Sequence, residues 1–220
     1  MSIACVKKIA FIYKKIYLTL DLCFDKDYNL GNVIEKEELM KLLIASDIHG
    51  SAFYCEKLMD AIRREKTDRI LLLGDLLYHG PRNDLPAGYA PKEVISMLNG
   101  LKQKLLCVRG NCEAEVDQMV LNFPVLADYA WLEIDGQRIF ATHGHHFGED
   151  NPPPLSKGDV LLCGHTHVPA CREHDGWIYL NPGSVSIPKE NSHHSYMILE
   201  NQNFIWKTLD GEIVNSVSFS

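Results

Sequence analysis

The stretch MKLLIASDIHG, residues 40–50, decides the fold. Its apolar run, residues 42–45, is followed at once by Asp47, His49 and Gly50. A short apolar run that ends in polar residues and a glycine predicts a buried strand with a tight turn behind it. The stretch therefore predicts the first strand of an α/β domain, with a carboxylate and an imidazole at its carboxyl end.

Strand and helix patterns alternate after this stretch. A helix is predicted over 52–64, with Phe53, Leu58, Met59 and Ile62 facing inward, and a second helix over 91–101 begins at Pro91. Strands are predicted over 69–73 and 105–108. This order of strands and helices predicts a parallel sheet with helices packed on it.

The second half of the chain is rich in strands. They are predicted over 130–134, 138–142, 160–163, 177–181, 195–200 and 204–209. Gly, Asp and Asn turns join most of them, which favours partly antiparallel pairing. Two sheets packed face to face and flanked by helices accommodate both halves. We therefore predict one α/β domain over residues 40–220.

The composition excludes several classes of protein. The chain has 220 residues, a formal charge of −7 and a hydrophobic fraction of 46%, which excludes collagen-like, disordered and coiled-coil classes. The acidity argues against a nucleic-acid-binding protein, which needs a basic face. No apolar run reaches the roughly 20 residues of a membrane span, so no membrane partner is expected. Seven cysteines without a CxxC pair favour a cytoplasmic protein with reduced thiols.

Residues 1–39 differ from the rest. They contain six Lys and six Asp or Glu, so the whole net charge lies in residues 40–220. No strand–turn–helix pattern organises them, and our hypothesis is that the native chain starts at Met40. The alternative is an amphipathic docking helix over residues 9–20.

Residues that commonly bind metals follow five of the predicted strands. They are Asp47, His49, Asp75, Asn111, His143, His165 and His167. Loops at the carboxyl ends of strands converge in α/β sheets, so these side chains are expected at one site. A lone Gly-Asp or Gly-Asn is usually only a turn, whereas two imidazoles in Gly-His-x-His rarely serve packing alone.

This set of residues indicates two metal ions. Carboxylates and imidazoles without a cysteine set suit Mn²⁺, Fe or Zn²⁺, and seven ligands are too many for one catalytic ion. Asp75 is the expected bridge. Two ions about 3.5–4 Å apart can hold a hydroxide and polarise a phosphoryl oxygen, which predicts hydrolysis of a phosphate ester.

The motif order DxH, GD, GN, H and GHxH resembles that of the calcineurin-like metallophosphoesterase superfamily. The stretches 79–83, 108–113 and 181–188 resemble its bacterial YfcE-type phosphodiesterases. The resemblance covers about residues 40–200 and implies a four-layer α/β/β/α sandwich with a dinuclear centre, commonly loaded with Mn²⁺. It assigns one ion to Asp47, His49, Asp75 and His167, and the other to Asp75, Asn111, His143 and His165.

Four further residues are candidates for catalysis. Superfamily members with a GNHE motif have a histidine at the position of Cys112, and a neutral thiol stabilises a leaving oxyanion less well. His79 is the candidate substitute, and His145 is placed to contact the substrate or a metal ligand. Arg109 is the candidate phosphate clamp because its forked donors match phosphate oxygens. Each also has an ordinary reading as a turn, packing or surface residue, and the turn at 181–188 borders the site or is only a bend.

The expected activity is therefore that of a phosphodiesterase with two divalent ions, Mn²⁺ first and Zn²⁺, Fe or Ni²⁺ as alternatives. Arg109, His79 and His145 would orient a small diester, attacked by a hydroxide that bridges the ions. A phosphomonoesterase and a non-catalytic scaffold, such as the retromer subunit of the superfamily, are the alternatives. The substrate and the question of a homo-oligomer stay open.

Overall fold

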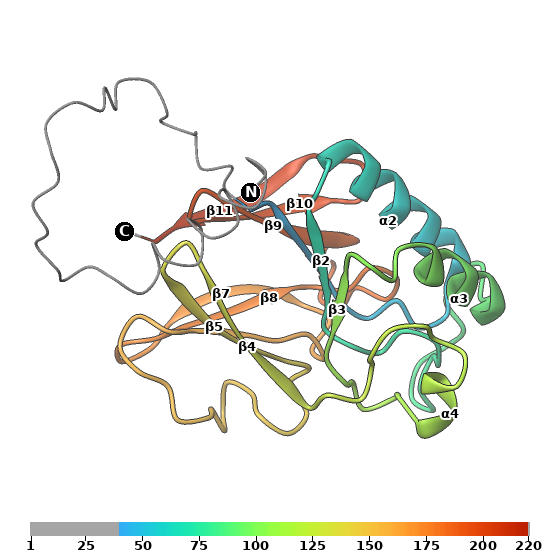
Figure 1. Ribbon diagram of the computed structural model, residues 1–220, viewed down its shortest axis with the longest axis horizontal. Helices are drawn as coiled ribbons and strands as arrows, with labels where there is room; N and C mark the ends of the chain where they lie inside the picture. The colour runs from blue at the N-terminus through green and yellow to red at the C-terminus, as the bar shows by residue number, and fades with distance from the viewer. Residues whose placement is uncertain (1–39, 220) are drawn as a thin grey trace, which may run out of the picture. The chain divides into compact units, whose positions relative to one another are not determined.

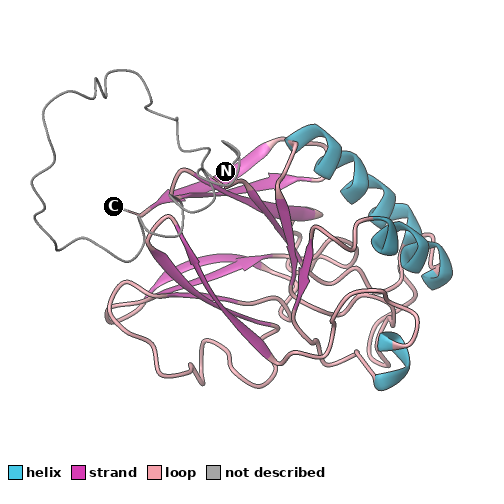
Figure 2. Ribbon diagram, viewed as in Figure 1, coloured by secondary structure: helices cyan, strands magenta, loops and turns pink. Residues whose placement is uncertain are grey.

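The computed structural model describes residues 40–219, and its strands form two sheets (Figures 1 and 2). The first sheet has the order β11-β10-β9-β1-β2-β3. Its parallel strands are β1 (Leu42–Ala45), β2 (Arg69–Leu72) and β3 (Leu105–Cys107). Its antiparallel strands are β9 (Ser195–Glu200), β10 (Asn203–Thr208) and β11 (Ile213–Ser218).

The second sheet has the order β4-β5-β6-β8-β7. Its strands are β4 (Tyr129–Ile134), β5 (Gln137–Thr142), β6 (Val160–Leu162), β7 (Pro169–Glu173) and β8 (Ile178–Pro182). Strands β5, β6 and β8 are mutually parallel, and β4 and β7 pair antiparallel at the two edges. Each sheet therefore has three parallel strands whose carboxyl ends can present loops to a common site.

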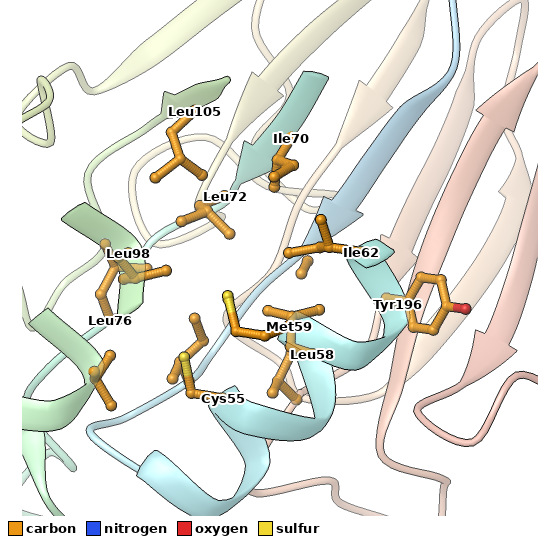
Figure 3. Close-up of a cluster of buried hydrophobic side chains, with 14 of the residues drawn as sticks. Cys55, Leu58, Met59, Ile62, Ile70, Leu72, Leu76, Leu98, Leu105 and Tyr196 are labelled. Carbon is orange, nitrogen blue, oxygen red and sulfur yellow. The ribbon is translucent and has the colours of Figure 1, made fainter. Parts of the chain in front are cut away.

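The two sheets pack face to face, and helices cover the outer face of the first. Every residue of β1 is fully buried, because Leu42 and Ile44 face the second sheet while Leu43 and Ala45 face the helices. Helices α2 (Ala52–Glu65) and α3 (Pro91–Gly100) form that outer layer. In Figure 3, Leu58 and Met59 of α2 lie over the sheet together with Cys55 and Ile62. This two-sided burial explains the continuous apolar run that the sequence shows.

Helix α2 begins and ends at recognisable capping residues. The Ser51 side chain accepts a hydrogen bond from the backbone N–H of Tyr54 (3.2 Å), which caps the amino end. Lys66 closes the carboxyl end with a φ of 54°. The prediction of Phe53 as an inward residue is wrong: 49% of it is exposed, and Cys55 faces the core instead. Phe53 and Cys55 are both apolar and lie two positions apart, so the apolar pattern alone did not show which of them faces the core.

The outer face of the second sheet differs from the expected fourth layer. The connection between β5 and β6, residues 143–159, covers that face and contains no helix. Its Phe147 and Leu155 pack with Trp177 against Phe140 and Tyr179 of the sheet. The α/β/β arrangement is thus present, with a loop where an α layer was predicted. Aromatic side chains of the loop and the sheet bury this face, and the loop sequence carries no periodic apolar pattern of a helix.

The predicted elements agree with the structure to within one residue at each end. The sequence analysis missed β7, β11 and the short helix α4 (Glu115–Gln118). Both missed strands lie at sheet edges, and β11 is largely exposed, so neither carries a strong apolar pattern. Within residues 40–219, no helix is both long and apolar enough to cross a membrane. The hypotheses on residues 1–39 lie outside the described residues.

Candidate metal centre

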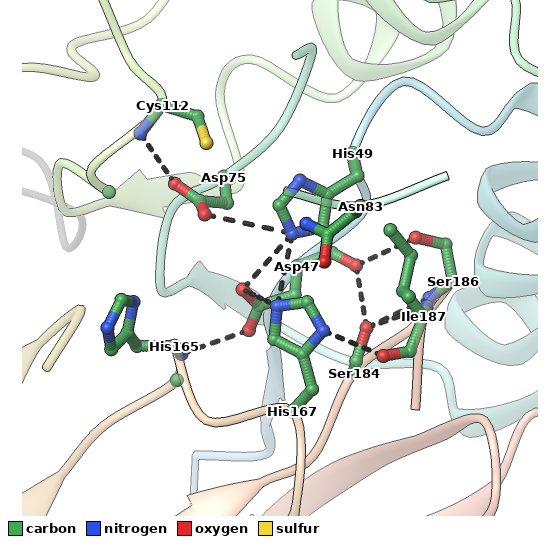
Figure 4. Close-up of polar contacts among 12 residues, drawn as sticks. Asp47, His49, Asp75, Asn83, Cys112, His165, His167, Ser184, Ser186 and Ile187 are labelled. Atoms are coloured by element: carbon green, nitrogen blue, oxygen red, sulfur yellow. Dashed lines mark hydrogen bonds and ion pairs between the residues drawn. The ribbon is translucent and has the colours of Figure 1, made fainter. Parts of the chain in front are cut away.

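The seven side chains predicted as metal ligands converge at the carboxyl ends of the parallel strands. Asp47 and His49 follow β1, and Asp75 and Asn111 follow β2 and β3. His143 follows β5, and the loop after β6 carries His165 and His167. Ligand atoms of Asp47, His49 and His167 lie within 4.8 Å of one another, as do those of Asp47, Asp75 and His143. Both sheets therefore contribute to one cluster (Figure 4).

Asp75 lies between the two halves of the cluster. Its Oδ2 is 3.4 Å from Nε2 of His143 and 3.7 Å from Nε2 of His49. His143 Nε2 is in turn 3.0 Å from Oδ1 of Asn111 and 3.2 Å from Nδ1 of His165. The Asp75 carboxylate is the group that can reach cations held on either side.

Asp47 supplies an oxygen without a hydrogen-bond partner. The residue is fully buried, and its Oδ1 makes no hydrogen bond of good geometry, although His167 Nε2 lies at 3.2 Å and His49 Nε2 at 3.5 Å. A buried carboxylate oxygen is costly unless a donor or a cation satisfies it. Asp47 therefore fits a metal ion in the space between its carboxylate and these two rings.

Backbone carbonyl oxygens orient three of the four imidazoles. Nδ1 of His49 donates to the carbonyl oxygen of Tyr78 (2.8 Å), that of His143 to Leu73 (2.6 Å), and that of His167 to Ile187 (2.7 Å). Each bond leaves Nε2 of a neutral ring as a free acceptor that faces the cluster. A partner on the second ring nitrogen is the usual arrangement of a histidine that binds a metal. His165 differs, because its Nδ1 faces His143.

The ligand-bearing turns have unusual backbone geometry. Asp47, His49, Asp75, His165 and His167 all have φ between 49° and 67°, which non-glycine residues rarely adopt. Such conformations cluster at functional sites and need support from the surrounding structure. The N–H of His49 donates to the carbonyl oxygen of Asp75 (2.8 Å), which links the turns after β1 and β2.

Two glycines permit the close approach of these turns. A Cβ on Gly110 would lie 2.1 Å from Oδ1 of Asp75, and one on Gly164 would lie 2.0 Å from Oγ of Ser46. Neither space can hold a side chain, because the Asp75 backbone nitrogen lies beside Gly110 and the buried Ser46 and Asp47 side chains lie beside Gly164. The glycines of the Gly-Asn and Gly-His motifs are therefore required by packing.

The charges of the cluster oppose one another. Burial acts to raise the pKa of Asp47, but the neighbouring His167 and His49 rings hold that pKa well below its usual range. The pKa of Asp75 is likewise lowered, by His143 against burial. Burial acts to lower the pKa of His143, but bonding to Asp75 raises that pKa to about 9. Ionised carboxylates thus lie against imidazoles, as a cation site requires.

The turn after β8 supports the first ligand. The hydroxyls of Ser184 and Ser186 both donate to the carbonyl oxygen of Asp47 (3.0 Å each). Asn181 Nδ2 donates to the carbonyl oxygen of Gly164 (2.7 Å), in the loop that carries His165 and His167. Residues 181–188 therefore border the cluster and hold two of its turns.

The four candidate catalytic residues lie at different places. Cys112 lines the cavity over the cluster, and its Sγ is within 4.8 Å of ligand atoms of both His49 and Asp75. Burial raises the pKa of the Cys112 thiol, so it is neutral in this structure. The ring of His145 is 5.4 Å from that of His143, and burial lowers the pKa of His145 to about 4.

Arg109 and His79 do not line the cavity. Arg109 points to the carbonyl oxygen of Glu113 (3.5 Å), and the His79 ring packs edge-on against Tyr78 and Tyr89. His145 is also absent from the cavity wall. The roles of these three residues in orienting a substrate stay predictions.

Other residues, which the sequence analysis did not select, line the cavity or support it. Arg82, Asn83, Thr166 and Lys189 form part of the wall. The buried Glu113 carboxylate accepts hydrogen bonds from the backbone N–H groups of Asp75 (2.9 Å), Leu76 (2.7 Å) and Gly110. Two sequence features could have pointed to these residues: the stretch that follows His79, which contains Arg82 and Asn83, and the acidic Glu113 two positions after Asn111.

Two packed sheets with a carboxylate–imidazole cluster at their strand ends define the class of metal-dependent phosphoesterase folds. The chain belongs to the calcineurin-like phosphoesterase superfamily, whose domain model matches residues 40–203. Phosphodiesterase YfcE of Escherichia coli K12 is 47% identical over 163 residues, which cover 74% of this chain and 89% of that protein. The solved structure of the E. coli phosphoesterase YfcE matches with a TM-score of 0.80 and 44% identity, over 82% of this chain and 100% of that one.

A more distant relative supports the fold alone. Wild-type Vps29 of Entamoeba histolytica, solved in complex with Zn²⁺, matches with a TM-score of 0.56 and 23% identity. The match covers 82% of this chain and 100% of that one. The comparisons confirm the resemblance that the motifs indicated and the metallophosphoesterase fold.

Proposed function

We propose that the chain is a metal-dependent phosphodiesterase with a dinuclear centre that acts on a small diester. One observation carries the proposal. The Oδ1 atom of buried Asp47 lacks a hydrogen-bond partner and lies beside two imidazole Nε2 atoms that are themselves 3.2 Å apart. A single divalent cation can satisfy all three atoms together. The 47% identity to a phosphodiesterase supports the choice of reaction.

The arrangement supports two cation positions that share Asp75. Asp47, His49 and His167 form the first position with Asp75, and Asn111, His143 and His165 form the second with the same carboxylate. Mixed oxygen and nitrogen donors are compatible with Mn²⁺, Zn²⁺, Fe and Ni²⁺, and Mn²⁺ stands first because the family resemblance implies it.

Bound divalent ions would supply an activated water and would neutralise charge on the phosphoryl oxygens. The residues of the chain do the positioning. The three backbone carbonyl contacts hold the rings of His49, His143 and His167 in fixed orientations. The backbone N–H of Cys112 donates to Oδ1 of Asp75 (2.9 Å), which leaves Oδ2 toward the cluster. The neutral Cys112 thiol is placed to contact a leaving oxygen without carrying charge.

The test compares two chromogenic esters after chelation and after Mn²⁺ is added back. We expect Mn²⁺-dependent hydrolysis of bis-p-nitrophenyl phosphate with little turnover of p-nitrophenyl phosphate. Dominant turnover of the monoester would replace the proposal with a phosphomonoesterase. Two bound ions without turnover of either ester would favour a non-catalytic scaffold.

The scaffold alternative is weaker on the ligand set. A protein that uses this fold only for binding is expected to lose ligand residues, whereas all seven positions are filled here. We place the enzyme in the cytoplasm because the five cysteines of the described residues are all free thiols. Fractionation of the source cells tests this location.

A further inference from the structure

Two cationic side chains lie on the cavity wall outside the metal-ligand cluster. The cavity has a volume of about 440 Å³, and the part of its wall away from the ligands contains Arg82, Asn83, Thr166 and Lys189. Arg82 and Lys189 are both exposed, and neither forms an ion pair with a carboxylate of residues 40–219. They come from separate connections, one after β2 and one after β8.

Several other cations of the described residues pair with acidic side chains, although some exposed ones, such as Lys157, do not. Lys41 and Lys207 both pair with Glu65, and Arg172 pairs with Glu149. The chain carries a formal charge of −7, so carboxylates are plentiful. Two unmatched cations at the opening of one site are therefore available to an anionic ligand.

Hydrogen bonds fix the backbone beneath each cation. The turn that carries Arg82 is closed by Asn83, whose backbone N–H donates to Gly80 O (3.4 Å) and whose Nδ2 donates to His79 O (2.8 Å). The N–H of Lys189 donates to the carbonyl oxygen of His167, one of the candidate ligands (3.2 Å). The Lys189 backbone is thereby tied to a ligand-bearing turn, and the turn that carries Arg82 is closed by its own hydrogen bonds. Both long side chains keep their reach.

We infer that Arg82 and Lys189 form an anion subsite that selects phosphodiesters bearing a second phosphate group on one ester arm. The inference rests on the proposed function, because it places the scissile diester on the metal cluster. A diester carries one negative charge, which the metal centre itself can balance. A terminal phosphate adds nearly two more, and the arginine fork and the lysine ammonium match its oxygens.

The test uses a matched pair of chromogenic diesters. They are thymidine 5′-(p-nitrophenyl phosphate) and the same compound with a phosphate on its 3′ oxygen. With the Mn²⁺-loaded full chain, we expect kcat/KM to be about tenfold higher for the 3′-phosphorylated ester, mainly through a lower KM. The preference should shrink as NaCl is raised, because both cations are exposed.

Substitution then assigns the preference to these residues. In the double variant Arg82→Gln/Lys189→Gln, the ratio of the two kcat/KM values should fall to nearly one. Lys157→Gln, an exposed lysine remote from the cavity, is the matched control and should keep the full ratio. Thermal unfolding of each variant checks that the fold is intact.

Three results would overturn the inference: no preference in the unmodified protein, a preference that survives the double substitution, or an equal loss of rate for both esters. The last would place the two cations on the scissile phosphate itself.

If neither ester is hydrolysed, the proposed function fails separately. Whether the anion subsite exists is then tested by calorimetry, with adenosine 3′,5′-bisphosphate and adenosine 5′-phosphate binding to the metal-loaded protein. The inference requires that the bisphosphate binds more tightly and that this difference disappears in the double variant.

Discussion

The Nε2 atoms of His49 and His167 lie 3.2 Å apart, and each ring donates its Nδ1 hydrogen to a backbone carbonyl oxygen. In neutral rings, both Nε2 atoms then carry lone pairs that repel each other across a water-poor space. A cation between the two rings converts that repulsion into two coordinate bonds.

Metal binding should therefore stabilise the fold. At a free metal concentration about 100 times the Kd, the expected gain is about 2.7 kcal/mol, or a rise in Tm of roughly 5–10 °C. Differential scanning calorimetry of the chelated protein with and without Mn²⁺ measures it. His167→Ala should lose most of the rise, and His193→Ala, an exposed histidine outside the cluster, should keep it.

Asp75→Asn should abolish activity and leave the fold intact. An amide can still accept the hydrogen bond from the Cys112 N–H through its oxygen, but it cannot bridge two cations as a carboxylate does. We expect a loss of kcat of at least about 100-fold, with an unchanged circular dichroism spectrum. Full activity in this variant would refute the bridging role.

Gly110→Ala should destabilise the protein and impair the site together. The added Cβ would lie 2.1 Å from the Asp75 carboxylate and 2.5 Å from the Asp75 backbone nitrogen. Overpacking of this kind costs about 1–3 kcal/mol. The control is Gly100→Ala at the end of α3, where a Cβ meets no atom within 4 Å and stability should hold or rise. Urea unfolding curves of both variants provide the comparison.

Glu65→Gln should destabilise the fold in a pH-dependent way. The buried carboxylate binds Lys207 (2.8 Å), Lys41 (3.3 Å) and the Tyr196 hydroxyl (2.8 Å). Burial acts to raise the pKa of Glu65, but the bonds from Lys207, Tyr196 and Lys41 together outweigh it and lower that pKa. A lowered pKa means that the carboxylate contributes its full stability above about pH 5 and loses it as the pH falls through the folded-state pKa.

The difference in unfolding free energy between wild type and Glu65→Gln should thus be largest near pH 7 and shrink toward pH 3. We expect about 1–3 kcal/mol at pH 7. Glu56→Gln, on the exposed face of the same helix, should show no such difference. A pH-independent loss in Glu65→Gln would mean that packing, and not charge, carries the effect.

Cys112→His should preserve or raise the rate on diesters. The side chain lies on the cavity wall beside the candidate ligands, and an imidazolium stabilises a leaving oxyanion better than a neutral thiol. The effect should be larger for esters with poor leaving groups. Steady-state rates on a series of aryl diesters measure it, and a large loss would show that the size or chemistry of the thiol is required.

Much of the fold could be read from local sequence. The strands β1, β2 and β6 are short apolar runs buried on both faces, and periodicity reveals such runs without any tertiary information. The helix over Ala52–Glu65 carries an amphipathic pattern and a serine cap. The edge strand β7 has no such pattern, because its partner is on one side only and its Arg172 and Glu173 are exposed.

The candidate site likewise has a part that local sequence predicts and a part that it does not. The seven ligand candidates stand next to strand ends and glycines, so sequence order alone placed them in one cluster. The cavity wall did not follow that rule: Arg82 lies inside the stretch 79–83 and Lys189 directly after 181–188, but only the tertiary structure brings the two to the same opening.

The sequence by itself determined the class of fold, the set of candidate ligands and their place at the carboxyl ends of strands, because these depend on residue type and short-range periodicity. The tertiary structure alone decided which imidazole nitrogen faces the cluster, that a loop covers the second sheet, and which cations border the cavity. Those features depend on contacts between residues far apart in the chain, such as the bond from His143 to Leu73, seventy positions away.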